Sequence, residues 1–300
     1  MLLSINRFVN ARRLAKHGAV GVLIESSRLS WCHIVSSGES EQVLSFDNSV
    51  YSNISELDGL LDKALNYAKI HRALVGVFLA YPLCVYHSIP CEDLPKNSRD
   101  KKQFLQWRLR HLFGADYLQG KWISEFFLGK CGDKNIANVY LIDHDIAALP
   151  SLRWHESLLF VQSFALAPLM GEAHSPHGPR IRLLFLDTYW SLSCEHNKTL
   201  RFCQFQLWSE AYLAEALASI KNYYEMAAEY FDIAESEPVL LHVDAAASAY
   251  ITDLMQLFPR ASIVGLADAG IEHSSHSDGY AACIAALATV REGCLARTYA

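Results

Sequence analysis

Apolar and polar positions follow the same order in two separate parts of the chain, residues 19–46 and residues 180–206. Each part has an apolar run, a short polar turn, a second strand-like segment, a second turn and a third strand-like segment. A long amphipathic stretch of helical periodicity and another apolar run follow each part, and they predict a helix and a buried strand. Self-similarity at such a spacing indicates two copies of one supersecondary unit. The pattern therefore predicts a duplicated α/β fold with two lobes.

The periodicity also predicts where the elements lie. Ser55 and Asp58 have the spacing of a capping box at the start of a helix. Apolar residues then recur with a period of about 3.6 residues until His71. The expected strands are 19–24, 29–35, 42–46, 73–80, 181–187, 190–196, 200–206, 238–243 and 262–266, and the expected later helices are 209–231, 247–258 and 278–291.

Residues 83–149 interrupt the first half after Pro82 and are punctuated by glycines. Their pattern predicts a small inserted α+β subdomain, with strands at 83–89, 121–128 and 136–143 and a helix at 100–113. The expected organisation is a basic leader (1–17), a first lobe (18–82 with 150–172), the inserted subdomain (83–149) and a second lobe (180–300).

The composition excludes several classes of protein. The chain has 300 residues, 51% of them hydrophobic, which is enough for one large or two medium domains with proper cores. A net charge of −6 argues against a general nucleic-acid binder. Eight cysteines without a CxxC pair indicate reduced thiols rather than a disulfide framework or a zinc site. No apolar run reaches the roughly 18–20 residues of a membrane-spanning helix.

The leader carries Arg7, Arg12, Arg13 and Lys16 without an acidic residue, and it lacks the apolar core of a signal peptide. One interpretation is a frayed, solvated segment. The other is a weakly basic surface helix that touches anionic lipid, which four charges alone would hold only marginally.

Other candidate chemistry is sparse. The pairs His174/His177 and His273/His276 have HxxH spacing, but each lies in a loop without cysteine or acidic partners, so solvated histidines are favoured over a metal site. The sequence contains no Walker A, GxGxxG, GxSxG or HExxH pattern. Cys32 and Cys194 occupy matching points of the two repeats, where buried structural thiols are expected. We therefore predict no metal and no catalytic residue.

The helix expected at 100–113 has two apolar faces. Leu105, Leu109, Leu112 and Phe113 share the face that would cover a sheet, and Phe104, Trp107 and His111 lie on roughly the opposite face. The second face either packs against the neighbouring subdomain or lines a groove for a partner segment, where aromatic anchors are favoured. In the second case Phe104 and Trp107 are anchors, and Phe113 shapes the floor of the groove from the core side.

Five stretches carry a resemblance to a known family: LPKNSRDKKQFLQWRLRHLFGAD, QSFALAPLM, IKNYYE, LLHVDAAASAYITDLMQLF and GYAACIAALA. Their order and spacing, over nearly the whole chain, resemble the PilM family of pilus-assembly proteins and the related MshI and GspL cytoplasmic domains. The resemblance implies an actin-like (ribonuclease-H-like) fold with two lobes and an inserted small subdomain.

Nucleotide-binding members of that family carry an Asp-x-Gly-Ser-like turn in each half. Glycine lets the backbone approach a phosphate, and the aspartate would position Mg²⁺. By resemblance, Leu23 holds the aspartate position of the first turn and Glu25 the glycine position, and Ser26 and Ser27 follow. Glu25 would place a carboxylate where phosphate should lie.

The second turn departs from the family pattern in the same way. By resemblance, Phe185 holds the aspartate position and Asp187 the glycine position, next to Thr188, and Ala245 and Ala246 replace a glycine pair after the late strand. An alternative register makes Asp187 itself the metal-binding aspartate, although no glycine follows it. The turns favour an actin-like fold that has lost its nucleotide, and no cofactor is expected.

By resemblance we expect a non-enzymatic cytoplasmic scaffold, peripheral to the inner membrane, of a type IV (MSHA-like) pilus or type II secretion assembly platform. Its expected partner is the cytoplasmic tail of a bitopic, PilN-like inner-membrane protein, with an assembly ATPase as a further partner, weak membrane-surface contact and no nucleic acid. The alternative is an active ATPase or sugar kinase of the same superfold, which needs intact phosphate loops. A relative of the cell-division actin-like proteins would carry an amphipathic C-terminal anchor, and the final residues REGCLARTYA do not fit one.

Overall fold

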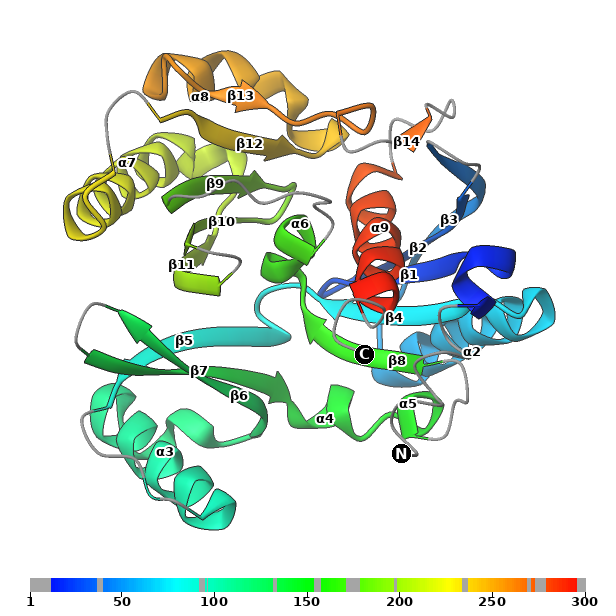
Figure 1. The fold of residues 1–300 in the computed structure, drawn as a ribbon, viewed down its shortest axis with the longest axis horizontal. Helices are drawn as coiled ribbons and strands as arrows, with labels where there is room; N and C mark the ends of the chain where they lie inside the picture. The colour runs from blue at the N-terminus through cyan, green and yellow to red at the C-terminus, as the bar shows by residue number, and fades with distance from the viewer. Residues whose placement is uncertain are drawn as a thin grey trace.

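A computed structural model describes residues 12–36, 40–91, 95, 97–131, 134–153, 158–170, 179–196, 199–233, 237–268, 271–272 and 279–295. These residues form two mixed sheets, each the centre of one lobe, and a third, antiparallel sheet (Figure 1). Among the described helices, none combines the length and the apolar character needed to span a bilayer.

The first lobe contains a six-stranded sheet in the order β14-β3-β2-β1-β4-β8. Its strands are β1 (Ala19–Ile24), β2 (Arg28–Ser36), β3 (Glu41–Val50), β4 (Leu74–Leu79), β8 (Leu158–Ser163) and β14 (Ile271–Glu272). Helix α2 (Ile54–His71) connects β3 to β4 and buries its apolar stripe against this sheet. After β8 come a 3-10 turn η2 (Phe164–Leu166) and the short helix α6 (Ala167–Met170). The strand β8 was not expected, because residues 158–170 form one apolar run that does not show where a strand stops.

The start of α2 differs slightly from the expected capping box. Asn53 is the N-cap and accepts a hydrogen bond from the Glu56 amide at 3.0 Å, while the Glu56 carboxylate accepts one from the Ser52 amide at 2.8 Å. The pair therefore lies two residues before Ser55 and Asp58. Asp58 instead accepts a hydrogen bond from the Ser151 amide at 3.2 Å, which ties α2 to the segment after the insertion.

The inserted subdomain has a three-stranded sheet in the order β5-β7-β6, covered by helix α3. Its elements are β5 (Cys84–Pro90), α3 (Ser98–Phe113), η1 (Ala115–Leu118), β6 (Lys121–Cys131) and β7 (Lys134–Asp143). Two short helices, α4 (His144–Ala147) and α5 (Pro150–Arg153), lead back to the first lobe. In Figure 1 this subdomain lies below the second lobe, with α3 on its outer side.

The second lobe contains a five-stranded sheet in the order β11-β10-β9-β12-β13. Its strands are β9 (Pro179–Phe185), β10 (Tyr189–His196), β11 (Thr199–Leu207), β12 (Val239–Val243) and β13 (Ser262–Ile263). Helix α7 (Leu213–Tyr230), after the turn η3 (Glu210–Tyr212), and helix α8 (Ile251–Leu257), after the turn η4 (Ala245–Tyr250), pack on one face of this sheet.

The duplication extends to single backbone hydrogen bonds. In both lobes the backbone amide of the residue after the fourth core strand donates a hydrogen bond to the carbonyl at the end of the first strand. The amide of the residue after the third strand donates one to a carbonyl of the hairpin turn. These bonds are Ala80 N to Ile24 O (2.9 Å) and Asp244 N to Phe185 O (3.2 Å), with Tyr51 N to Ser27 O (2.9 Å) and Trp208 N to Thr188 O (3.1 Å). A β-bulge also recurs, between His33 and Ile34 in β2 and between Cys194 and Glu195 in β10.

The last helix of the chain, α9 (Tyr280–Leu295), packs on the first lobe, although we expected all of 180–300 to form the second. Strand β14 pairs with β3, and α9 lies against β1, β2 and β4. The approach is so close that a Cβ on Gly21 would lie 2.0 Å from the amide nitrogen of Ala286. Glycine on β1 and alanines on α9 allow this contact, which the order of the elements along the chain does not reveal.

The described end of the leader, residues 12–17, is helical and is part of the fold. Leu14 is 3% exposed and packs with Ala19, Ile34 and Leu287, so the interpretation of a frayed segment is wrong for these residues. Arg7 lies outside the described residues.

Candidate functional site

Each lobe presents one hairpin turn to the boundary between the lobes. In the first, the Glu25 amide donates to the Arg28 carbonyl at 2.8 Å, with Ser26 and Ser27 at the exposed tip. In the second, the Leu186 amide donates to the Tyr189 carbonyl at 3.0 Å. Asp187 and Thr188 form that tip, with Asp187 exposed and Thr188 half-buried.

An aromatic side chain binds each turn in the same way. The Tyr51 hydroxyl donates to the Glu25 carbonyl, and the indole Nε1–H of Trp208 donates to the Leu186 carbonyl at 2.8 Å. Both aromatic residues follow the third strand of their lobe. These paired contacts hold the two turns in matching conformations, and they identify Leu186 as the structural counterpart of Glu25.

This register corrects the sequence-based alignment of the second turn by one residue. The counterpart of Leu23 is Leu184 rather than Phe185, and Asp187 corresponds to Ser26 rather than to Glu25. A one-residue shift turns a strand residue to the other face of the sheet, and Phe185 indeed packs with Trp208 and Tyr250 in the α7–α8 core. Asp187 lies at the hairpin tip, and the described residues contain no cluster of three His, Cys, Asp or Glu that could hold a metal.

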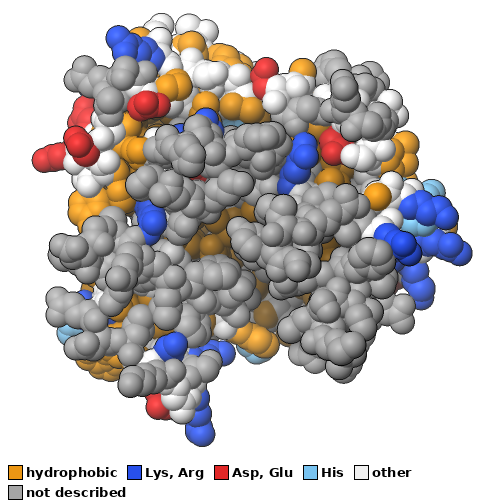
Figure 2. Space-filling model, viewed as in Figure 1, with side chains coloured by type: hydrophobic (Ala, Val, Ile, Leu, Met, Phe, Trp, Pro, Cys, Tyr) orange, Lys and Arg blue, Asp and Glu red, His pale blue; other side chains and the backbone are white. Residues whose placement is uncertain are grey.

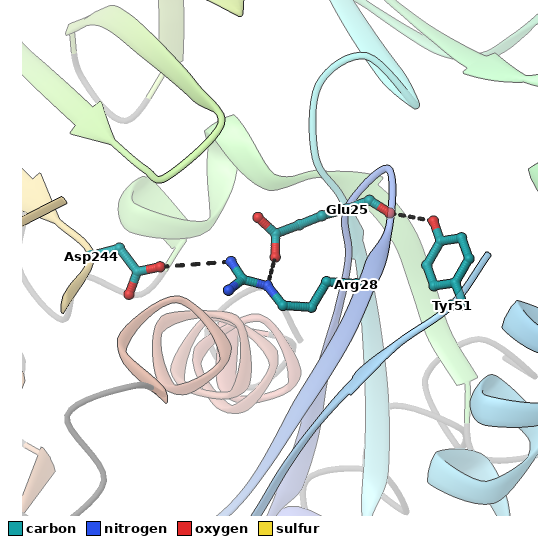
Figure 3. A network of polar contacts seen from close by, with 4 residues as sticks. All are labelled: Glu25, Arg28, Tyr51 and Asp244. Atoms are coloured by element: carbon teal, nitrogen blue, oxygen red, sulfur yellow. Dashed lines mark hydrogen bonds and ion pairs between the residues drawn. The ribbon is translucent and has the colours of Figure 1, made fainter. Parts of the chain in front are cut away.

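The side chain of Glu25 is engaged in an ion-pair network between the lobes (Figure 3). Glu25 is 3% exposed, and its Oε2 lies 2.5 Å from Nε of Arg28. Arg28 Nη2 in turn lies 3.9 Å from Oδ2 of Asp244, which follows β12 of the second lobe and is 4% exposed. The guanidinium of Arg28 thus lies between one carboxylate from each lobe.

Burial alone would lower the pKa of Arg28. The hydrogen bond and charge of Glu25, together with the charges of Asp244 and Asp187, outweigh burial and raise the pKa of Arg28 above its ordinary value. Arg28 therefore stays charged and reduces the repulsion between Glu25 and Asp244 across the lobe boundary.

Beneath this network, apolar side chains from both lobes form one cluster. Leu23 and Phe78 from the first lobe, Leu184 and Leu186 from the second, and Ile284 from α9 are all buried in it. The positions that a magnesium-binding aspartate would need, Leu23 and Leu184, are 0% and 3% exposed leucines. The arrangement can bind the lobes to each other, and a polyphosphate placed at the turns would face Glu25 and Asp244.

Arg28 and Asp244 are the residues whose role the sequence did not reveal. Both stand next to the turns singled out above, but no local pattern shows that two positions so far apart meet. Ala245 and Ala246 begin the 3-10 turn η4, and their side chains lie outside the described residues, as do His174, His177, His273 and His276. Cys32 and Cys194 are buried, as expected, but they do not occupy matching points, because the shared bulge pairs Cys194 with His33.

The second candidate surface is the outer face of α3. Trp107 is 56% exposed and stacks on His111 with ring centroids 5.6 Å apart, whereas Leu105 and Leu109 form the buried face. The interpretation of Trp107 as a residue packed against the neighbouring subdomain is therefore wrong. Phe104 is partly buried and packs against the core of the subdomain. The centroid of its ring lies 5.9 Å from that of Trp107.

Phe113 does not lie on the core side as expected. It is 47% exposed and packs on the rings of His87 and Tyr117, with centroids 4.5 and 4.7 Å away. Leu112 is also 47% exposed. Both belong to the last turn of α3, beyond the buried Leu105 and Leu109, so they add to the exposed apolar surface of the subdomain.

Comparison with solved structures identifies the fold. PilM of the PilM–PilN type IV pilus biogenesis complex matches with a TM-score of 0.64 and 13% identity, over 93% of this chain and 99% of that one. A protein of unknown function with an actin-like ATPase fold, from Bacteroides thetaiotaomicron, matches with a TM-score of 0.52 and 10% identity, over 83% of this chain and 91% of that one. The cytoplasmic domain of EpsL, from the type II secretion system of Vibrio cholerae, has a TM-score of 0.49 and 17% identity, over 92% and 94% of the two chains.

The chain therefore has an actin-like ATPase fold with two lobes and a small antiparallel sheet, which confirms the expected fold class. No family model and no curated protein sequence matches it.

Proposed function

We propose that this chain is a non-enzymatic cytoplasmic scaffold of a type IV (MSHA-like) pilus or type II secretion assembly platform, and that it docks the cytoplasmic tail of a bitopic, PilN-like inner-membrane protein. The observation that carries the proposal is the exposed aromatic face of α3. Trp107 is 56% exposed, although the opposite face of the helix already covers the three-stranded sheet. The likeness to PilM, which was solved as part of a complex with PilN, supports a partner of that kind.

The lobe boundary supports the non-enzymatic part of the proposal. Glu25 and Asp244 share the guanidinium of Arg28 there, and leucines take the positions where metal-binding aspartates are needed. A phosphate group would have to displace Arg28 from two carboxylates or approach them directly, and either event is electrostatically unfavourable.

The docking surface can be tested with a synthetic peptide of the cytoplasmic tail of the bitopic protein encoded nearest to this chain's gene. Replacing Trp107 by alanine should weaken peptide binding by about 30-fold or more, the loss of roughly 2 kcal/mol that defines a hot spot. The free energy of unfolding should change by only about 0.5 kcal/mol, because the ring is largely exposed. Titration calorimetry and chemical denaturation measure the two effects.

Tyr212→Ala is the matched control, because Tyr212 is an aromatic residue 64% exposed on the second lobe, and its loss should leave binding unchanged. A second control addresses an apolar hollow of about 590 Å³ beside Pro90, which Met226 and Tyr230 also line. Peptide binding that survives Trp107→Ala but is lost on Met226→Ser would move the docking surface to this hollow and contradict the assignment to α3.

A further inference from the structure

Five basic side chains surround one hollow at the end of the first lobe that lies away from the hairpin turns. The hollow has a volume of about 340 Å³ and is lined by Arg12, Arg13, Lys16, His17 and Arg72. It lies near Ala19 and Leu74, where β1 and β4 begin. The ion-pair network of Glu25, Arg28 and Asp244 lies past the other, carboxyl ends of these strands.

Hydrogen bonds and packing fix the segments that form the hollow. Nε of Arg13 donates to the carbonyl of Arg72 at 2.6 Å, and its Nη2 donates to the carbonyl of Ala73 at 3.3 Å. These bonds join the helical residues 12–17 to the end of α2, where Arg72 adopts a left-handed conformation with φ of 57°. Buried Leu14 fixes the same segment from below. Two segments far apart in sequence are therefore held together with their charges on one surface.

The local charge contrasts with that of the whole chain. The net charge is −6, yet none of the five residues that line the hollow is acidic. Slight burial, and then the charges of Lys16, Arg72 and Arg13, lower the pKa of His17 below its ordinary value. Cationic side chains gathered on one surface attract anionic ligands.

An exposed apolar side chain that is close in sequence to Arg72 favours a membrane over a soluble anion. Ile70 is 78% exposed and lies in the last turn of α2, next to Lys69 and two residues before Arg72. Figure 2 shows Lys, Arg and His side chains gathered at the right edge of the molecule, where Figure 1 places α2. Basic residues with an exposed aliphatic side chain suit a surface that offers phosphates above and acyl chains below.

We propose that this basic hollow binds the phosphate headgroups of anionic phospholipids, with Ile70 entering the interface between headgroups and acyl chains. Arg72, which lines the hollow, follows the last residue of α2, and Figure 1 shows α2 at the right of the molecule and α3 at its lower left. Membrane contact through the hollow would therefore leave the aromatic face of α3 free. The proposal goes beyond the scaffold function and does not depend on it.

Flotation of the full chain with vesicles tests the proposal. The chain should float with vesicles of phosphatidylethanolamine and phosphatidylglycerol at low salt, and should not float with vesicles of phosphatidylcholine alone. The double variant Arg12→Ala with Lys16→Ala should weaken vesicle binding by roughly 30-fold. Each basic residue near an anionic surface contributes a similar share of the binding free energy, and two are removed. Arg13 is kept because it binds the carbonyls at the end of α2.

Lys63→Ala with Arg260→Ala removes the same charge from exposed positions elsewhere and should leave vesicle binding unchanged. Ile70→Ser should weaken binding without lowering the melting temperature. Equal flotation of the Arg12/Lys16 double variant and the parent would overturn the proposal. So would failure of the parent to float, or binding of duplex DNA or RNA in place of vesicles.

Discussion

The two lobes share one backbone plan but differ in the side chains on their inner faces. They repeat the same hairpin, the same aromatic contact to the turn and the same bulge. In the first lobe the inner positions are Gly21, Phe78 and Ile34, whereas their counterparts in the second are Arg182, His242 and Glu195.

The difference follows from what each face contacts. The apolar face of the first lobe accepts the alanine-rich α9 almost backbone to backbone. In the second lobe, the polar residue His242 contacts the start of that helix. Its Nδ1 lies 2.8 Å from the Tyr280 hydroxyl, which donates its hydrogen to the Val264 carbonyl at 2.7 Å. A duplicated backbone thus keeps its geometry while each copy adapts its inner face to a different neighbour.

The largest expected effect concerns the buried ion pair of the second lobe. Arg182 Nη2 lies 2.5 Å from Glu195 Oε1, and both side chains are 3% exposed. Arg182→Met should cost about 3–5 kcal/mol in the free energy of unfolding, because it leaves a buried carboxylate unpaired. The double variant Arg182→Met with Glu195→Leu should recover most of that loss, since it resembles the apolar first lobe. A single variant that costs less than about 1 kcal/mol in chemical denaturation would show that the pair is unimportant.

A smaller effect is expected where α9 meets the first lobe. Gly21→Ala should destabilise the fold by about 2–3 kcal/mol, because the added methyl group would overlap the backbone of Ala285 and Ala286. Gly59 in α2 is the matched control. A Cβ there meets nothing within 4 Å, so Gly59→Ala should stabilise the fold by about 0.5–1 kcal/mol. Equal behaviour of the two variants would contradict the close docking of α9.

The smallest effect on stability is a pH dependence that comes from the second lobe. Burial, and then the charge of Arg182, lower the pKa of His242 to about 3. The unfolded chain therefore binds a proton near pH 6.5 that the folded chain does not, so stability falls as the pH drops below that value. Between pH 7 and pH 5, His242 should account for a loss of about 2 kcal/mol. His242→Asn should flatten the stability curve over that window in chemical denaturation, and an unchanged slope would count against a neutral, buried His242.

Hydrophobic periodicity predicted the long helices and most strands, because core-facing positions repeat along each element, but it missed β8, β14 and the short helices. Relations between elements were harder to predict. The predicted alignment of the second hairpin was off by one residue. Phe185 and Leu184 are both buried, and the pattern does not show which of them faces the lobe boundary. Phe113 shares a helical face with Leu109, but the covered part of that face ends before it. The contact of Arg28 with Asp244 depends on how the lobes close, which neither segment encodes alone.

We propose that this actin-like fold works without a nucleotide, because Arg28, two carboxylates and packed leucines already occupy its lobe boundary. Titration calorimetry of the full chain with ATP and Mg²⁺ tests it most directly, with a nucleotide-binding actin-like protein as the positive control. We expect no saturable heat at millimolar ATP. A dissociation constant below about 100 µM, roughly −5.5 kcal/mol, would contradict it.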